Sequence, residues 1–527
     1  MNLTIDPWIP IRRQSGAEER IAPWQITETD DPVIALAAPR PDFNGALMQF
    51  LIGLFQTAAA PADQDAWVEW LETPPPPGEL KARFEPFLDA FALDADGPRF
   101  LQDFDELEGE ANPIDALLID EPTGQTLRNN TDHFVKRGRI DALCPACTAT
   151  ALFTLQTNAP SGGAGHRTSL RGGGPLTTLV VPDPEGGLPD TLWSRLWLNV
   201  LDANAVRSLS GNPERSEHSD IFPWLAPTRT SEPRTGQATT PADANPLQMY
   251  WGMPRRIRID WTKRTAGACS LCGEQAERVQ QYVTRNYGVN YTGPWQHPLS
   301  PHYVDKKSGA PMPVHAQPEG LTYRHWLDWV ERSESRLPAR VVELFNPDSG
   351  RRLPEEQLRL WVFGYDMDNM KARCWYEATF PLVLIDDSEI RHEFVQRVQT
   401  LIDTASEVAG YVQTCIKEAW FKRPKDARGD TSFLKAAFFQ HTEAGFQDSL
   451  RALKQAVAAR EDNRLLAAWH ATLRKVALDL FDFWAGEGDP AFGDPRRLAM
   501  AHKKLTGLLN GRKLKDRLMV NTQEEAA

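Results

Sequence analysis

The sequence predicts an α+β protein: a large mixed α/β N-terminal domain with a structural zinc site, followed by a C-terminal four-helix bundle. Three observations support this fold class. Short apolar and β-branched runs, separated by many prolines and glycines, fill residues 1–385. Two CxxC pairs lie within that part, at 144–147 and 269–272. Across residues 386–527, apolar residues recur at spacings of three and four.

The predicted elements of the first domain are short and separated by long loops. A helix is expected at 46–59, and a basic loop that carries one aromatic residue, Phe134, lies within 124–143. Residues 205–247, rich in Pro, Ser, Thr and charged residues, read as a long irregular insertion. Strands are expected within 3–13, 176–181, 250–262 and 282–291, and residues 301–311 have the pattern of a hairpin with Lys306 and Lys307 at its tip.

Four amphipathic segments make up the second domain. Each has an apolar stripe, and short polar joints separate them, which is the pattern of a four-helix bundle. The stripes include Phe394, Leu434, Leu465 and Leu498, one from each segment.

The bulk composition is that of a globular protein. The chain has 527 residues and an apolar share of 41%, enough for two or more domains. We find no run of about 18 apolar residues. The N-terminus also lacks the basic region followed by an apolar segment that is typical of a signal peptide. We therefore expect a cytoplasmic protein without membrane contact.

The net charge of −13 is unevenly distributed. Residues 1–120 hold 23 acidic and 7 basic residues, whereas the rest of the chain holds 48 acidic and 51 basic ones. The acidity therefore belongs to one end, and basic surfaces that bind nucleic acid remain possible elsewhere. The alternative is a soluble protein with mixed surface charge.

The four paired cysteines predict one zinc site. Thiolates from two CxxC pairs supply the four tetrahedral ligands that zinc takes in structural sites, and they leave no position open for catalysis. Four ordinary buried thiols are the alternative. The predicted ligands are Cys144, Cys147, Cys269 and Cys272.

A glycine-rich loop follows the first cysteine pair. Six of the fourteen residues at 161–174 are glycine, which allows positive φ angles and close backbone approach, but the loop contains no P-loop or dinucleotide-binding motif. Its N–H groups, with Arg167 and Arg171, suit contact with a nucleic-acid backbone or groove edge. A flexible surface loop is the alternative.

Signatures of catalysis are missing from the sequence. It lacks the HExxH, GxSxG and Walker motifs. Asp366 and Asp368 are the only pair that we single out as possible ligands of a divalent cation, and a turn rich in Asx residues is the simpler interpretation. We expect a protein that is not an enzyme; the alternative is a zinc-stabilised, metal-dependent nuclease.

Several segments, in their order and spacing, resemble the large subunit of the type I-E CRISPR Cascade surveillance complex, the CasA family. The resemblance covers most of the chain, and no single motif decides it. It is carried by residues 2–10, 143–153, 159–173, 269–272, 295–298 and 363–369, and by the helical C-terminus.

The resemblance implies a DNA-recognition subunit. Such a subunit reads the protospacer-adjacent motif (PAM) of double-stranded target DNA, starts strand separation for pairing with the CRISPR RNA (crRNA), and offers a docking surface to the helicase-nuclease. Its other partners are the 5′ handle of the crRNA and the backbone and small subunits of Cascade. Sequence beyond the PAM is read by base pairing.

The resemblance also implies roles for particular residues. The glycine loop that faces the PAM minor groove falls on Gly162, Gly163, Ala164 and Gly165. The wedge that opens the first base pair falls on Asp368, Asn369 and Met370, and a finger that reads base edges falls on Arg285 or Asn286. Lys306 and Lys307 match a lysine pair that contacts DNA, and Phe134 and Lys136 match the contact with the crRNA handle and neighbouring subunits.

Overall fold

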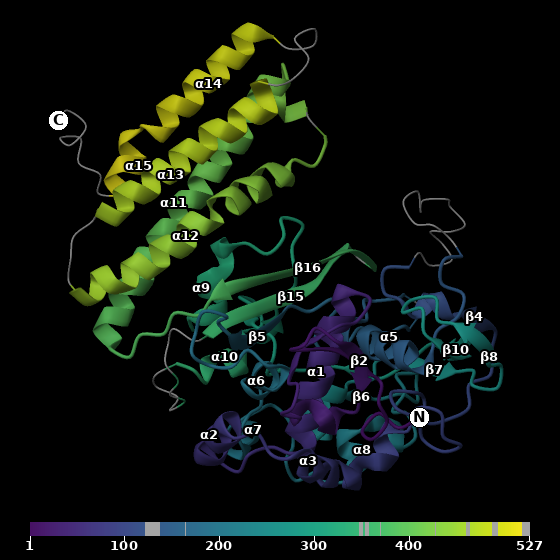
Figure 1. The fold of residues 1–527 in the computed structure, drawn as a ribbon. Helices are drawn as coiled ribbons and strands as arrows, with labels where there is room; N and C mark the ends of the chain where they lie inside the picture. Colours follow the sequence, from purple (N-terminus) through teal and green to yellow (C-terminus); the bar gives the residue numbers. More distant parts are fainter. Residues whose placement is uncertain are drawn as a thin grey trace. The chain divides into compact units, whose positions relative to one another are not determined.

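The described part of the chain forms two compact units. One unit consists of Met1–Ala316 and Arg332–Thr379, and the other of Gln317–Glu331 and Phe380–Ala527. Strands and short helices dominate the first unit and long helices the second (Figure 1), so the predicted α+β class is confirmed. This computed structural model describes residues 1–121, 138–163, 165–346, 351, 353, 358–368, 370–426, 428–459, 464–486 and 494–518.

The core of the first unit is built around helix α1, Pro41–Ala58. The helix begins five residues before the predicted start. Arg40 is its N-cap residue, and Pro41, which is well suited to the first helical position, begins its first turn. Phe50, buried at its centre, makes edge-to-face contacts with Trp8, Phe91 and Phe153, among others. The other helices of this unit are α2 (Gln64–Glu72), α3 (Pro77–Phe84), α5 (Pro145–Asn158), α6 (Leu192–Trp197), α7 (Ala203–Arg207), α8 (His218–Ile221) and α10 (Arg340–Glu343).

In the part of the chain that the structure describes, six small sheets surround this core, and three of them hold Arg20, Arg285 and Asp368. Strands β2 (Glu18–Ile21), β1 (Ile9–Arg13) and β3 (Val33–Leu36) form the N-terminal antiparallel sheet in that order. Strands β4 (Ala111–Pro113), β10 (Gln281–Arg285) and β7 (Arg256–Ile259) form a second. Strands β16 (Lys371–Pro381), β15 (Leu358–Asp368) and β5 (Thr177–Pro182) form a third.

The remaining sheets are smaller still. The hairpin predicted at 301–311 is present, since β12 and β13 pair antiparallel around the two lysines. The insertion at 205–247 contains only short elements, which agrees with its composition. These sheets consist of β6 (Ala238–Thr239) with β11 (Asn290–Tyr291), β8 (Thr265–Ala268) with β9 (Gln275–Arg278), and β12 (His302–Val304) with β13 (Pro311–Pro313) and β14 (Arg336–Leu337).

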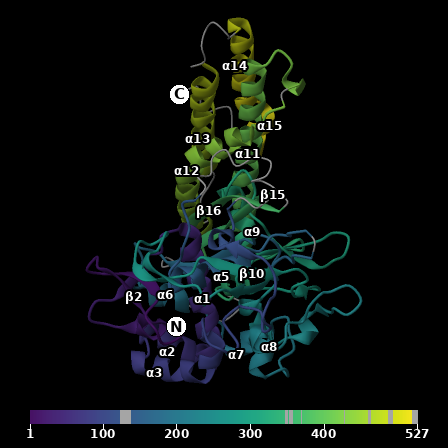
Figure 2. The same ribbon diagram turned by 90° about the vertical axis from the view of Figure 1, so that its right-hand side faces the viewer.

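The second unit is helical. Helix α11 packs against α12, α13 and α14, and these helices run side by side in both views (Figures 1 and 2). Asp387 and Asp494 cap the first turns of α11 and α14 with their carboxylates. The helices are α9 (Trp326–Val330), α11 (Ser388–Trp420), α12 (Ser432–Ala459), α13 (Arg464–Phe481), α14 (Pro495–Leu509) and α15 (Arg512–Arg517).

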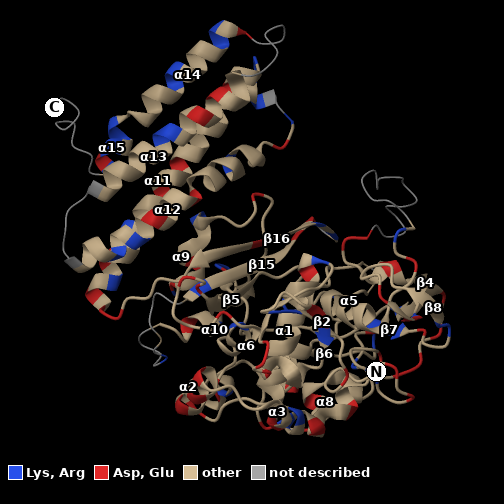
Figure 3. Ribbon diagram, in the orientation of Figure 1, with Lys and Arg blue, Asp and Glu red and all other residues tan. Residues whose placement is uncertain are grey.

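Charges of both signs are spread over both units (Figure 3). Acidic side chains gather on α2, in agreement with the acidic first 120 residues of the sequence. Among the described residues, we find no helix with the length and apolar character needed to cross a bilayer.

Candidate nucleic-acid interface and metal centre

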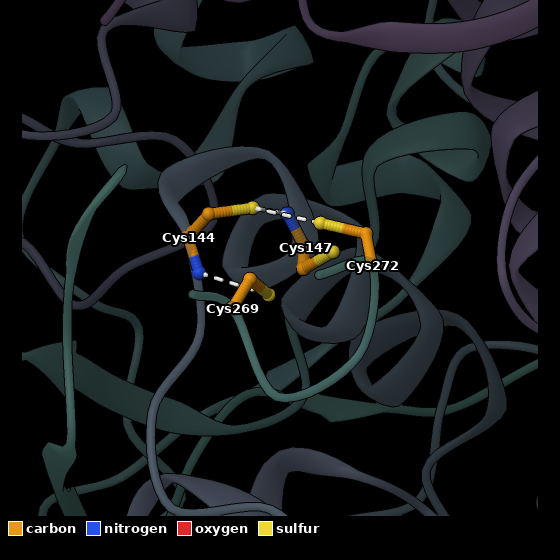
Figure 4. A group of neighbouring side chains, drawn as sticks. All are labelled: Cys144, Cys147, Cys269 and Cys272. Atoms are coloured by element: carbon orange, nitrogen blue, oxygen red, sulfur yellow. Dashed lines mark hydrogen bonds between the residues drawn. The ribbon is translucent and has the colours of Figure 1, made fainter. Parts of the chain in front are cut away.

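The start of helix α5 places the first cysteine pair. Cys144 is the N-cap residue, and its sulfur accepts the backbone N–H of Cys147 at 3.4 Å. The second pair lies on the turn between β8 and β9, where Gly273 takes a φ of +76° that a side chain would disfavour. A bond from the Cys144 N–H to the sulfur of Cys269, at 3.3 Å, joins the two segments. The two local turns therefore bring the sulfur atoms of both cysteine pairs close together (Figure 4).

The four thiols form a compact cluster, as predicted. Their sulfur atoms all lie within 4.8 Å of one another, and those of Cys144 and Cys272 are 3.8 Å apart. Sulfurs bound tetrahedrally to zinc at about 2.3 Å are themselves about 3.8 Å apart. Hydrogen bonds from the Cys144 and Cys147 thiols lower the pKa values of both Cys269 and Cys272. The donor set and its spacing therefore fit a zinc ion.

The glycine loop is a tight, exposed turn. The N–H of His166 donates to the carbonyl of Gly163 at 2.8 Å, and the N–H of Gly162 donates to the carbonyl of His166 at 3.2 Å. Gly163 and Gly165 have φ angles of +65° and +84°, which L side chains rarely adopt. Gly162 and Gly163 are exposed, so backbone rather than side chain faces the solvent here. Ala164 lies outside the described residues.

The end of strand β10 packs directly against this loop. The N–H of Tyr287 donates to the carbonyl of Gly165 at 2.8 Å, and Tyr287 itself has a positive φ of +62°. A side chain at Gly165 would place Cβ only 2.6 Å from the Tyr287 ring. Arg285 and Asn286, the predicted finger residues, are both exposed just before this contact. The finger and the glycine loop are therefore neighbours.

The tip of the β15–β16 hairpin lies on the other side of the loop. A Cβ built on Gly163 would lie 3.9 Å from the sulfur of Met370. Met370 is 53% exposed, which is unusual for so apolar a side chain, and Asp368 is exposed as well. Asn369 lies outside the described residues. The structure thus brings together three segments that the sequence separates by more than 80 residues each.

The carboxylates of this hairpin have a basic partner. Arg373, opposite on β16, makes two hydrogen bonds to Asp366, at 2.9 and 2.7 Å, and approaches Asp368 at 4.0 Å. The side chain of Asp366 is buried within the pair. A carboxylate that is held by a guanidinium is a poor ligand for a divalent cation. This geometry does not favour the nuclease alternative.

The arginines of the loop take roles that the sequence did not predict. Arg171 was expected to face nucleic acid, and this expectation is wrong. Its side chain is buried and donates to Thr177 and Ser300, each at 3.1 Å, and to Gln49. Burial lowers the pKa of Arg171 to about 9. Arg167 donates to the Ser231 hydroxyl at 2.7 Å. Both side chains therefore fix the loop to the rest of the unit.

A different arginine supports the exposed turn. The guanidinium of Arg255 donates to the carbonyl of Pro160, and a Cβ built on Gly162 would lie 2.7 Å from its Nη1 atom. Burial lowers the pKa of Arg255 to about 10. The sequence placed this arginine on an alternating strand but gave no signal of its role, because the contact spans 95 residues.

The lysine pair occupies a separate hairpin. Lys306 and Lys307 are exposed on the turn between β12 and β13. The carboxylate of Asp305 holds this turn by accepting both the N–H and the hydroxyl of Ser308, at 2.8 and 2.7 Å. Phe134 and Lys136, the predicted contacts with the crRNA handle, lie outside the described residues.

Solved structures with a similar fold define its class. Cse1 of Thermobifida fusca matches with a TM-score of 0.70 at 17% identity, over 99% of this chain and 98% of that chain. CasA (Cse1) of Thermus thermophilus matches with a TM-score of 0.66 at 17% identity, over 97% and 99%. A chain of a CRISPR RNA-guided surveillance complex matches with a TM-score of 0.62 at 16% identity, over 97% and 99%.

The sequence itself gives the family. Residues 2–480 match the family model of CRISPR-associated protein Cse1. Since this match spans nearly the whole chain, the chain belongs to the Cse1 family, as the resemblance of its motifs implied.

Proposed function

We propose that this chain is the large subunit of a type I-E Cascade complex and that it reads the PAM of double-stranded target DNA through the minor groove. The observation that carries the proposal is the proximity of three exposed segments. The glycine loop at 162–165 lies between Tyr287, which follows Arg285, and Met370 at the tip of the hairpin. One surface thus presents the backbone of the glycine loop, the guanidinium of Arg285 and the apolar side chain of Met370.

Each part of this surface suits one step of PAM recognition. The minor groove is narrow, and a turn without side chains brings backbone groups closest to it. An exposed apolar side chain at a hairpin tip suits insertion between base pairs, which costs a few kcal/mol per unstacked step. The exposed guanidinium of Arg285 suits hydrogen bonds to base edges or phosphates. The surface therefore holds the groups needed to read a PAM and to start strand separation.

The wider assembly follows from the family. Two of the matching structures are of a CRISPR RNA-guided surveillance complex, which supports partnership with crRNA and other Cascade subunits. We assign PAM and crRNA-handle recognition, including Phe134 and Lys136, to residues 1–385. We propose that residues 386–527 form a four-helix bundle, that the chain is not a catalyst, and that it docks the helicase-nuclease in the cytoplasm. The four cysteines would hold a structural zinc ion.

A matched pair of glycine variants tests the proposed surface. Gly163→Asp places a carboxylate beside the proposed DNA path, while Gly16→Asp places the same group on the exposed turn between β1 and β2. Both glycines have positive φ, at +65° and +89°, so the backbone cost is similar. We expect Gly163→Asp to weaken binding of a PAM duplex by the reconstituted complex about tenfold or more, because it blocks close approach and repels phosphates.

The measurement is a gel-shift titration on two duplexes that differ only in the PAM. Gly16→Asp should match the wild-type complex on both. Asn369→Ala provides a second variant, which lies between β15 and β16 in the sequence, and it should weaken binding of the PAM duplex in the same way. If both Gly163→Asp and Asn369→Ala bind each duplex as the wild type does, the surface does not read the PAM.

A further inference from the structure

The metal centre has a charged neighbour from a distant part of the chain. Arg20 lies on β2 of the N-terminal sheet, opposite Pro10 of β1. Its Nη2 atom lies 3.2 Å from the sulfur of Cys272 and 3.7 Å from the sulfur of Cys144. The guanidinium therefore reaches one sulfur from each cysteine pair, across more than a hundred residues of sequence.

Glu274 completes this arrangement. It follows Cys272 by two residues and forms an ion pair with Arg20. The side chain of Arg20 is 23% exposed, so its charge is only partly solvated. The neighbouring cations of the same sheet have other partners: Arg12 pairs with Glu18 at 3.9 Å, and Arg13 pairs with Glu19 and Glu28. Among these three arginines, Arg20 alone is directed at the thiols.

A cavity lies beside the thiols, and Arg20 lines it. The cavity has a volume of about 410 Å³. Cys147, Cys272, Arg20 and Glu274 line it together with Trp8 and other residues of the N-terminal sheet. Cys272 is the half-buried member of the four thiols, and the others are buried. The cavity is therefore a route by which water or a chelator would reach the sulfurs, and Arg20 lies on that route.

We propose that Arg20 is a positioning residue of the metal centre, which retains the zinc ion and fastens the N-terminal sheet to both cysteine pairs. The inference rests on the zinc site proposed above. Zinc with four thiolates carries a net charge of about −2. A guanidinium that donates hydrogen bonds to two of the sulfurs offsets part of this charge and holds both sulfurs in place. Sulfurs that are held in place leave the ion more slowly when a chelator competes for it.

Zinc release from the full-length protein tests this role. We expect Arg20→Gln to release zinc to an excess of chelator about tenfold faster than the wild type, as followed with a coloured indicator. Arg20→Lys should fall between the two, because a lysine keeps the charge but lacks the planar fork of donors. Arg12→Gln is the matched control: it removes an exposed arginine of the adjacent strand and should release zinc at the wild-type rate.

The outcomes separate this inference from the DNA-binding proposal. Release from both Arg20 variants within about twofold of the wild-type rate would overturn it. The cobalt-substituted proteins give a second measurement, since loss of the N–H donors to sulfur should shift the thiolate-to-cobalt absorption bands in Arg20→Gln and leave them unchanged in Arg12→Gln. Wild-type protein without zinc, by elemental analysis, would overturn both the zinc site and the role of Arg20, and would leave PAM reading to be judged by the gel shifts alone.

Discussion

The φ angle of Tyr287 determines how Arg285 is presented at the surface. Tyr287 adopts a positive φ of +62°, a conformation that costs about 1 kcal/mol or more for a residue with a side chain. The bond from its N–H to Gly165 and the packing of its ring against that glycine hold this conformation. The chain therefore turns sharply after Arg285 and leaves that side chain in the solvent beside the glycine loop.

Substitution of Arg285 tests whether it reads bases or only phosphates. If its guanidinium contacts base edges, Arg285→Ala should lose about 1–3 kcal/mol of discrimination between duplexes with and without the PAM. Lys263→Ala removes another exposed cation of the same unit and should leave discrimination unchanged. Competition binding with the two duplexes gives the measurement. An equal loss of affinity for both duplexes would assign Arg285 to phosphate contact instead.

At the scale of residues, spacing and composition predicted the cysteine cluster but not the arginine network. A CxxC pair carries its geometry locally, so two pairs are enough to predict one site. Arg171 lies in a glycine-rich, polar stretch that gives no sign of burial. It is buried because Gln49 and Ser300, more than a hundred residues away on either side, supply its acceptors. The proximity of Gly163 and Met370 depends on folding in the same way.

The proposed role of the β12–β13 hairpin depends on the positive charge that it carries. Its turn, fixed by Asp305, presents Lys306 and Lys307 to the solvent. We expect the double variant Lys306→Ala/Lys307→Ala to weaken DNA binding by the complex equally with and without the PAM, because phosphate contacts carry no sequence information. The plot of log affinity against log salt should become shallower by about two. A loss confined to the PAM duplex would contradict this assignment.

Periodicity predicted the elements with the strongest patterns. Helix α11 begins at Ser388, directly after its Asp387 cap, close to the predicted boundary of 386. The hairpin at 301–311 and the strand at 177–182 were also recognisable. The run at 282–291 was not a single strand, since β10 ends at Arg285 and the positive φ of Tyr287 interrupts it. A local pattern cannot show such a break when a distant loop stabilises it.

Two histidines buried near Arg171 should make the stability of the protein sensitive to acid. Burial, and then the charge of Arg171, lowers the pKa of His302 to about 4 and that of His297 well below its ordinary value. Both are therefore neutral in the folded protein, while the unfolded chain binds protons below about pH 6.5. The contribution of these two histidines to stability should be constant above that pH and should fall as pH decreases from about 6.5 to 4, by up to about 1.4 kcal/mol per unit for His302.

Chemical unfolding at a series of pH values, followed by tryptophan fluorescence, measures this slope. His302→Gln keeps a polar side chain that does not titrate in this range, so it should reduce the dependence on pH even if stability at neutral pH is lower. An unchanged slope in this variant would assign the acid sensitivity to other groups.

The class of the whole fold could be predicted from the sequence, but the division of the chain between its units could not. Tyr323 stacks on Phe446 with ring centroids 4.2 Å apart, and its hydroxyl bonds to Thr442 at 2.8 Å. These contacts join residues 317–331 to helix α12, although the segment is short and lies among loops of the first unit in the sequence. Its periodicity is too brief to predict this membership.

The segment 317–331 determines how the protein can be divided into fragments. The chain passes between the two units at three places, after Ala316, Glu331 and Thr379. No single cut yields the helical unit whole: a fragment that starts at Phe380 leaves Tyr323 and Trp326 behind and uncovers the aromatic surface that they pack against. An exchange of helical units between relatives must therefore carry residues 317–331 along with the C-terminal helices.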